Sequence, residues 1–360
     1  MVDLSCYKKI NIYFFGNEEQ KRDFIKNLIF PYFSAKYFGR YFVTREWNGG
    51  PNIEIVFSGN DILKEDIEKS INEYCKDIGL FLSRDEIEKN ISIYKKNQKT
   101  LLSMEKKKKI EIDSSNHLKV KISSLYMEYY KKLYNSSEHV KLHFESRFIL
   151  EPCIEKAIYK INNKVDMLFL VMQLFRQTMN LFEYGEKYAS MMYYSNIAGV
   201  FAIAKQYNKY DVFKNNYEKL YNKYDIKNFD YKEKDEEVVT CFKNAWDKIY
   251  ENCKKLVKNN VLSEEGYYNL SEQEKQMIYN VSNINSEFHT AFINDEKLHD
   301  IVTGDIHLTF RSIVNILYNI LPILNITFVE KNFCCYSIVR YVMAKYNTSW
   351  KEIFEERSLS

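Results

Sequence analysis

Alternating and clustered apolar residues near the N-terminus predict a β-α-β-β arrangement in residues 1–60. Residues 9–15, KINIYFF, are rich in β-branched and aromatic side chains, which is typical of a short strand. Residues 18–33 begin with acidic residues and then carry apolar side chains at a helical spacing, at Phe24, Ile25, Leu28 and Ile29. Residues 37–47 and 52–57 are the second and third predicted strands.

The stretch REWNGGPNIEIVF, residues 45–57, predicts a hairpin around a tight turn. Glycine can adopt positive φ and proline fixes φ, so the sequence Asn48 to Pro51 favours a turn. Side chains alternate across a strand, which divides the residues after the turn into two faces. One face holds Ile53, Ile55 and Phe57, and the other holds Asn52, Glu54 and Val56. Glu54 therefore lies either on a solvated strand face or at the edge of a site.

The chain after residue 60 has mostly helical periodicity, and the whole predicts an α+β protein with a small, mainly antiparallel sheet at its N-terminal end. Ser83 and Glu86 form a capping-box pattern, and Pro322 is expected to end or kink a late helix. The predicted helices cover residues 61–78, 83–98, 165–207, 236–258, 271–293, 307–324 and 331–346. We expect a single unit over 1–360, with an opening at 1–60, a helical part at 61–98, a charged loop at 99–117 and a mainly helical remainder at 118–360.

Charge and cysteine content narrow the class of protein. The net charge is +3, and the one dense basic run, EKKKK at residues 105–109, is better explained as a solvated loop than as a nucleic-acid or membrane patch. No stretch is long and apolar enough for a membrane span, and no secretory signal is recognisable. Seven scattered cysteines, an odd number without C-x-x-C, favour reduced, buried thiols in a cytoplasmic protein.

Motifs for metals and phosphates are weak or missing in the sequence. His139 and His143 are spaced i, i+4, but no H-E-x-x-H surrounds them, so buried or surface histidines are the simpler interpretation. The chain has no Gly-rich phosphate loop and no G-x-S-x-G, and the vicinal Cys334 and Cys335 lie in an apolar helix. We therefore expect no metal and no organic cofactor.

Three polar groupings remain as candidates for chemistry. The first surrounds the hairpin, and the second alternates along HFESRFILEP, where strand geometry would align His143, Glu145 and Arg147. The third lies on one face of the predicted helix at residues 307–324, where three of its residues are spaced i, i+4. Each has a plainer interpretation as a salt-bridged or solvated face. The groupings are Arg45, Trp47, Asn52 and Glu54; His143, Glu145, Arg147 and Glu151; and Asp305, His307, Arg311 and Asn315.

The opening of the chain resembles that of the elimination domain of class I lanthipeptide dehydratases, which also occurs as a stand-alone thiopeptide-type bacteriocin biosynthesis protein. The resemblance covers about 50 residues and centres on F-[FV]-x-R-x-W-x-G-G-P followed by an alternating strand. A late segment, RSIVNILYNILPI, adds weaker matches at Ser312, Val314 and Asn319. The matched opening positions are Phe42, Val43, Arg45, Trp47, Gly49, Gly50, Pro51, Ile53, Ile55 and Phe57.

The resemblance implies an enzyme that acts on a ribosomal precursor peptide. Such domains remove glutamate from glutamylated Ser or Thr, and relatives join two dehydroalanines into a pyridine ring and release the leader peptide. Five positions that the family uses are replaced here: the histidine and two arginines after Gly-Gly-Pro, the late-helix histidine, and the arginine that follows Asn319. The replacements are Asn52, Glu54, Val56, Asn315 and Ile320. A glutamate cannot bind a glutamyl carboxylate as an arginine does, because like charges repel.

Three hypotheses follow from the resemblance and these departures. The first is an elimination-type or derived reaction on modified Ser or Thr, with Arg45, Glu54, Arg147, Arg311 and Asn315 as candidate catalytic residues. Trp47, Asn52, Glu145 and His307 are then the candidate substrate-binding residues. The second is pyridine-ring formation from dehydroamino acids. The third is a non-catalytic peptide-binding partner of a separate glutamyl-transfer or other modifying enzyme. In each, a leader-bearing precursor peptide is the expected partner, without nucleic acid.

Overall fold

The computed structural model describes residues 7–36, 40–46, 51–58, 64–79, 81–105, 111–125, 136–231, 235–259, 262, 286–293 and 304–359. The chain divides into two compact units. Unit 1 contains residues 1–127, 154–159 and 322–325, and unit 2 contains residues 128–153, 160–321 and 326–360.

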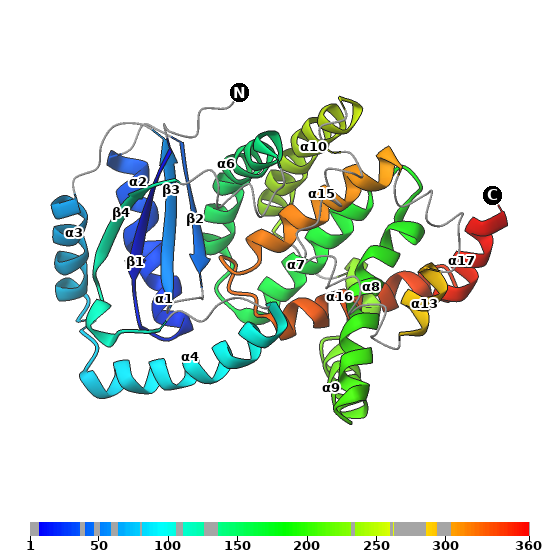
Figure 1. Ribbon diagram of the computed structural model, residues 1–360, viewed down its shortest axis with the longest axis horizontal. Helices are drawn as coiled ribbons and strands as arrows, with labels where there is room; N and C mark the ends of the chain where they lie inside the picture. The colour runs from blue at the N-terminus through cyan, green and yellow to red at the C-terminus, as the bar shows by residue number, and fades with distance from the viewer. Residues whose placement is uncertain are drawn as a thin grey trace. The chain divides into compact units, whose positions relative to one another are not determined.

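Unit 1 is built on a four-stranded antiparallel sheet with the order β2-β3-β1-β4 (Figure 1). The strands are β1 (Tyr7–Tyr13), β2 (Arg40–Glu46), β3 (Asn52–Ser58) and β4 (Val120–Ser124). β3 pairs Ile55 with Ile10 of β1 and with Val43 of β2. Because these three side chains lie opposite one another and are fully buried, they form the centre of the sheet's apolar face.

A continuous helical segment packs on that apolar face: α1 (Glu18–Phe24), a π-helical turn (Ile25–Ile29) and α2 (Phe30–Lys36). Asn17 and Gln20 form a capping box at its start. Pro31 has no backbone N–H, and the wider turn just before it accommodates the missing helical hydrogen bond. Buried Phe33 contacts Phe57 of β3, with ring centroids 6.5 Å apart. Unit 1 also contains α3 (Lys64–Asp77), α4 (Arg84–Glu105) and a short 3-10 turn (Ser114–Asn116).

Unit 2 is helical in the part of the chain that the structure describes. α8 packs against α16, α13 and α7, and α10 packs against α15 and α7 (Figure 1). Its elements are α6 (Ser137–Lys160, of which 154–159 group with unit 1), α7 (Lys164–Met179), α8 (Glu186–Gln206), α9 (Tyr210–Lys223), a 3-10 segment (Ile226–Tyr231), α10 (Glu236–Lys258), α13 (Glu287–Ile293), α15 (Asp305–Ile320), α16 (Phe328–Lys345) and α17 (Trp350–Leu359).

The α+β prediction is confirmed, and most predicted helices agree with the structure within a few residues. The capping box at Ser83 and Glu86 forms, and α15 ends at Ile320, two residues before Pro322. The prediction for residues 271–293 lies largely outside the described residues, which contain only its end, α13. None of the described helices combines the length and apolar character that crossing a bilayer requires.

Three local predictions are wrong. Residues 137–160 form α6 rather than a strand around HFESRF, because the segment continues without a break and Ser136 accepts from the His139 N–H at its start. The predicted charged loop at 99–117 is helical through Glu105, because the helical propensity of α4 extends beyond its apolar stripe. The strand β4 within residues 118–360 was not foreseen, because its short polar sequence, VKISS, gains its pairing only from β1.

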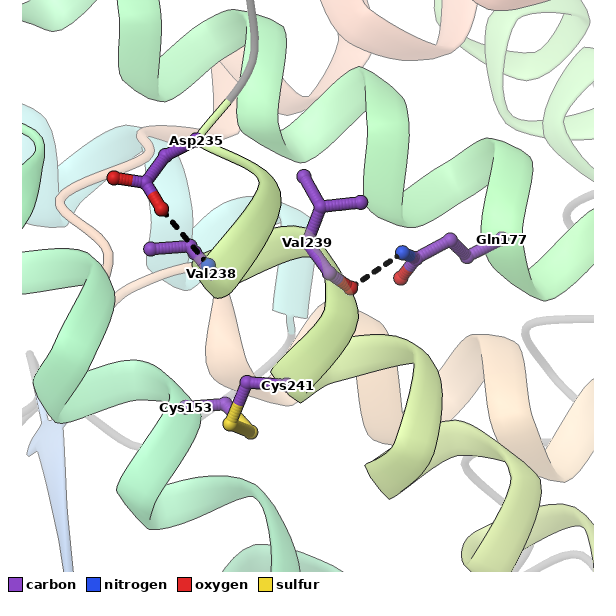
Figure 2. Close-up of a disulfide and its surroundings, with 6 residues drawn as sticks. All are labelled: Cys153, Gln177, Asp235, Val238, Val239 and Cys241. Atoms are coloured by element: carbon purple, nitrogen blue, oxygen red, sulfur yellow. Dashed lines mark hydrogen bonds between the residues drawn. A yellow bond between two sulfur atoms is a disulfide. The ribbon is translucent and has the colours of Figure 1, made fainter.

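A disulfide between Cys153 of α6 and Cys241 of α10 corrects the expectation that all cysteines are reduced (Figure 2). Their Cα atoms are 5.5 Å apart, within the range that the bond requires. α10 is also held nearby by Gln177 of α7, which donates to the Val239 carbonyl at 2.8 Å, and Asp235 caps its first turn. Cys75, Cys253, Cys334 and Cys335 are free and buried, as expected.

The disulfide is expected to stabilise unit 2, because it closes a long loop with a sequence separation of 88. Removing it should cost about 2–4 kcal/mol. We predict that the melting temperature falls by a similar amount in Cys153→Ser, Cys241→Ser and the double variant, because each variant removes the same single bond. Thermal unfolding with and without dithiothreitol measures this. A wild-type melting temperature that does not change on reduction would contradict the bond.

Candidate functional site

The charged residues of the hairpin are engaged in contacts within unit 1. Arg45 donates to Glu18 at 2.5 Å, to the Pro322 carbonyl at 3.3 Å and to the Asn325 side chain at 3.1 Å. Burial alone would raise the pKa of Glu18, but Arg45 and Lys21 outweigh this effect and lower it to about 2. Arg45 therefore joins β2 to the start of α1, at Glu18, and to the turn at residues 322–325.

Glu54 forms a cross-strand ion pair with Lys9 at 2.9 Å, and both side chains are largely covered. Glu54 faces Asn11 across β1, so Lys9 is its diagonal neighbour on the same face. Asn52, at the start of the same strand, is 7% exposed. Trp47 lies outside the described residues. Arg45 and Glu54 thus stabilise this sheet, and the family's arginine positions carry no cationic side chain here.

The α6 grouping differs from its predicted strand arrangement. His143, Arg147 and Glu151 follow at i, i+4 and i+8 and share one helix face, whereas Glu145 points away from them. Arg147 is 1% exposed; its Nη1 donates to the Asn319 carbonyl at 2.9 Å, and its Nη2 lies 3.8 Å from Glu151. A buried arginine at the last turn of α15 satisfies a carbonyl that the helix itself leaves open.

The stripe on α15 is partly solvated. His307 and Arg311 are half-buried and Asn315 is exposed. Burial, with a smaller effect of Arg311, lowers the pKa of His307 to about 4. Of the predicted site residues, Arg45, Asn52 and Glu54 lie in unit 1, and Glu145, Arg147, His307, Arg311 and Asn315 lie in unit 2. Within unit 2, the structure joins Arg147 to α15 through Asn319.

A polar network that the sequence analysis did not single out joins α8, α15 and α16. Asn196 of α8 donates to the Tyr318 hydroxyl at 2.7 Å, and this hydroxyl lies 3.6 Å from Cys335 Sγ. The Lys331 ammonium lies over the Tyr318 ring, 4.6 Å from its centroid. Asn196, Tyr318 and Lys331 are all half-buried, so this site borders solvent while its deeper side is closed by Cys335. We call these four residues the Tyr318 site.

A second, fully buried layer supports the Tyr318 site. Tyr193 stacks on Phe175 with ring centroids 4.6 Å apart, and its hydroxyl bonds with Thr178 at 2.6 Å. Both rings also meet the edge of Tyr318, at 6.1 Å from Phe175 and 6.3 Å from Tyr193. Such edge-to-face contacts fix ring orientation, so the Tyr318 ring is held from the core side.

The Tyr318 hydroxyl remains protonated at neutral pH. Burial, with smaller effects of Cys335 and Tyr193, raises its pKa well above the ordinary value of a tyrosine. Its oxygen accepts the Asn196 N–H, and its O–H can donate to Cys335 Sγ at 3.6 Å, a weak acceptor that a stronger oxygen acceptor would have to replace. Together with the Lys331 ammonium, the site offers a neutral donor and a positive charge, the groups that stabilise an oxygen gaining negative charge. Within the described residues, no three His, Cys, Asp or Glu side chains gather as a metal site would require.

Solved structures with the same fold are found by comparison, although no protein-family model and no curated protein sequence matches. The pyridine synthase TbtD, from thiomuracin biosynthesis, has a TM-score of 0.65 at 12% identity, covering 95% of this chain and 99% of TbtD. The chain has the fold of TbtD. TsrL aligns with a TM-score of 0.62 at 12% identity, covering 98% of each chain.

The fold match covers the middle of the chain, which the sequence resemblance could not reach. The assignment to the elimination-domain family itself stays a prediction. A sequence signal for the missed site exists in retrospect: MMYYSNIAGVFAIA places Ser195, Asn196 and Gly199 inside an otherwise apolar helix.

His143 should make the protein less stable in acid. Burial, Arg147 and His139 lower its pKa to about 3, so between pH 6.5 and 3 the unfolded chain binds a proton that the folded chain does not. This histidine therefore lowers the free energy of unfolding by up to about 1.4 kcal/mol per pH unit below pH 6.5. We predict that His143→Gln flattens the loss of stability between pH 7 and 4.5, measured by urea unfolding. Lys141→Gln, exposed on the same helix, is the control and should keep the wild-type slope.

Proposed function

We propose that this protein joins two dehydroalanine residues of a ribosomally synthesised precursor peptide into a pyridine ring. The observation that carries the proposal is the end-to-end fold match to a pyridine synthase, which covers 95% of this chain and 99% of the other. The hairpin resemblance points to the same broad class of peptide-modifying enzymes. The proposal takes the second of the three hypotheses and leaves glutamate elimination as the competing one.

The reaction balances without an oxidant or reductant. The amide that precedes the first dehydroalanine supplies C and N to the ring, and each dehydroalanine supplies its Cα and Cβ. One new carbon-carbon bond joins the two methylene carbons, and the other joins the amide carbon to the Cα of the second dehydroalanine. The six-membered adduct then holds one double bond, between N and the first Cα. Loss of water and loss of the acylamino group, as an amide on the leader, each add a double bond and complete the pyridine. Each loss removes one proton from a ring CH₂ and returns it to the leaving group. The chemistry therefore needs acid-base groups and oxygen stabilisation, and its balance calls for no organic cofactor or metal.

The Tyr318 site has groups suited to this reaction. An amide must first shift a proton from nitrogen to oxygen, and the Tyr318 O–H is a neutral donor that can hydrogen-bond that oxygen. Lys331 adds positive charge 4.6 Å from the Tyr318 ring. Asn196 orients the phenol through its 2.7 Å hydrogen bond. Such preorganised groups lower the barrier more than flexible water does.

The contacts of the hairpin residues argue against glutamate elimination. That reaction needs cations to hold a leaving glutamate, yet Glu54 places a carboxylate on β3 and is paired with Lys9. Arg45 is already bonded to Glu18, and Asn315, at the family's histidine position, is an exposed amide that cannot act as a base. Glu145 of α6 and His307 of α15 stay candidates for substrate binding, and Arg311 of α15 stays a candidate for catalysis. Arg147 is buried and bonded to the Asn319 carbonyl, which gives it a role in the packing of α6 and α15.

The proposal implies defined partners. The substrate is a leader-bearing precursor peptide that already contains dehydroalanines, so enzymes that glutamylate Ser and eliminate glutamate must act first. Such enzymes, including a separate glutamyl-transfer enzyme, are the expected cellular partners. A cytoplasmic location, where precursor peptides are made, is part of the same proposal.

Incubation of the purified protein with a dehydrated precursor tests the proposal by mass spectrometry. We expect a core peptide lighter by one water and separated from its leader, which appears as an amide. A parallel sample with glutamylated precursor should stay unchanged. Loss of glutamate without ring formation would instead support elimination, and tight leader binding without any mass change would support the non-catalytic hypothesis. Either result contradicts ring formation.

Tyr318→Phe isolates the contribution of the hydroxyl, because it keeps the ring contacts with Phe175 and Tyr193. We expect kcat for ring formation to fall by about 10²-fold or more, as for the loss of one oxyanion donor. The precursor Kd should stay within about twofold, since a donor that stabilises developing charge acts on the transition state rather than on the bound peptide. Tyr207→Phe, at a tyrosine that is 72% exposed, is the matched control. Equal kcat in both variants would exclude Tyr318 from the reaction.

A further inference from the structure

A hydrogen-bonded chain of Ser195, His289 and Ser286 connects α8 to α13. Ser195 Oγ lies 3.0 Å from His289 Nε2, and Ser286 Oγ lies 2.8 Å from His289 Nδ1. Ser286 also accepts weakly from the His289 backbone N–H at 3.5 Å, as a residue that caps a helix does. Both imidazole nitrogens are thus bonded, which fixes the ring plane. With Ser286 accepting from Nδ1–H, Nε2 is left as an acceptor for the Ser195 hydroxyl.

Ser195 behaves differently from two buried helix serines of unit 2, Ser190 and Ser312. Ser190 donates to the Lys187 carbonyl at 2.7 Å and Ser312 donates to the Leu308 carbonyl at 2.9 Å, each within its own helix. That local bond is the ordinary choice for a serine inside a helix. Ser195 instead bonds to a histidine far along the sequence. A capping role for Ser286 explains its bond to His289 Nδ1, but it does not explain why Ser195 bonds to His289 Nε2.

His289 is held in place by its neighbour and stays neutral. Phe288 is 5% exposed and packs against Tyr194, Trp350 and Phe354, with ring centroids 5.0, 5.5 and 5.0 Å away. This cluster anchors the short helix α13 against α8 and α17. Burial lowers the pKa of His289 below that of an ordinary imidazole, so it is an unprotonated base at neutral pH.

Gly199 leaves space beside the His289 ring. It lies one helical turn after Ser195 on α8, and a Cβ built there would meet His289 Cε1 at 3.8 Å, an ordinary contact. Glycine is a poor residue inside a helix, where alanine would be more stable. Apart from the two neighbouring residues and the backbone of α8 itself, no other atom of the described residues lies within 4 Å of that Cβ, so a substrate group could lie beside the histidine and the serine. Asn196 of the Tyr318 site follows Ser195 directly along α8.

We propose that His289 and Ser195 form the proton-transfer pair of this enzyme, which rests on the proposed ring formation. As water or the leader amide leaves, Ser195 Oγ accepts a proton from a ring CH₂ and passes its own proton to His289 Nε2. One C–H bond breaks and its electrons form the new ring double bond. The imidazolium then returns one proton through Ser195 to the departing oxygen or nitrogen. Both residues end unchanged, and the pair is ready for the second loss.

The histidine variant tests the pair through rate and pH dependence. We expect His289→Gln to lower kcat by about 10²-fold to 10⁴-fold, the range for a general acid-base group, with the precursor Kd within about twofold. The wild-type rate should fall as the pH drops through the lowered pKa of His289, because protonation removes the base, and His289→Gln should lose this acidic limb. Ser195→Ala, which suits a helix, should lose rate and keep the acidic limb. Lys141→Gln, at an exposed position on α6, is the control with wild-type kinetics.

The glycine variant separates a catalytic role from a structural one. Gly199→Ala should raise the melting temperature and yet slow ring formation, because its methyl group fills the space beside His289. A variant that is more stable and equally fast would overturn the placement of substrate there. Wild-type kinetics and an intact acidic limb in His289→Gln would overturn the acid-base pair while ring formation stands. Absence of ring formation by the wild-type protein, in contrast, would overturn the proposed function itself.

Discussion

The packing of α8 in the helical unit depends on pairing its half-buried polar side chains with partners from neighbouring helices. A buried hydroxyl or amide without a hydrogen bond costs roughly 1–3 kcal/mol. α8, packed against α16, α13 and α7, therefore carries polar residues where a neighbouring helix supplies a partner. Asn196 meets Tyr318, and Ser195 meets His289. Each of these bonds fixes two helices at once, so the requirement that stabilises the packing also holds acid-base groups at fixed positions.

The sheet unit obeys the same constraint with charges in place of neutral groups. Glu54 pairs with Lys9 across the strands, and Arg45 ties Glu18 to the turn at residues 322–325. These contacts hold the two hairpin strands in place. The charged groups of Arg45 and Glu54 are therefore already bonded within unit 1. The strands of the motif that resembles an elimination domain therefore have a structural role here, through their apolar face and their ion pairs.

Much of the fold could be predicted from the sequence because it rests on local patterns. Alternation predicts β1 and β3, and helical periodicity predicts α10 and, with the cap at Ser83, α4. β4 and α6 could not be predicted as well, since VKISS becomes a strand only by pairing with β1 and HFESRF is helical through tertiary packing. The Cys153–Cys241 bond also joins residues that no local spacing relates.

The candidate site was harder to predict than the fold, for the same reason. The hairpin motif is contiguous, whereas Asn196, Tyr318, Lys331 and His289 come from four helices and meet their partners only after packing. The only local sign of such a site in the sequence is a polar residue inside an otherwise apolar helix, such as Ser195 or Asn196. Their partners cannot be read from one sequence, because helix register and crossing decide them.

Hydrogen-deuterium exchange of the protein with and without a dehydrated precursor tests the location of the chemistry most directly. The account predicts slower exchange in α8, α13 and the last turns of α15, where Ser195, His289 and Tyr318 lie. The β2–β3 hairpin should exchange at an unchanged rate, because its charged residues are already bonded within unit 1. Protection confined to β2 and β3, with α8 and α13 unaffected, would contradict the account and return the reaction to the hairpin.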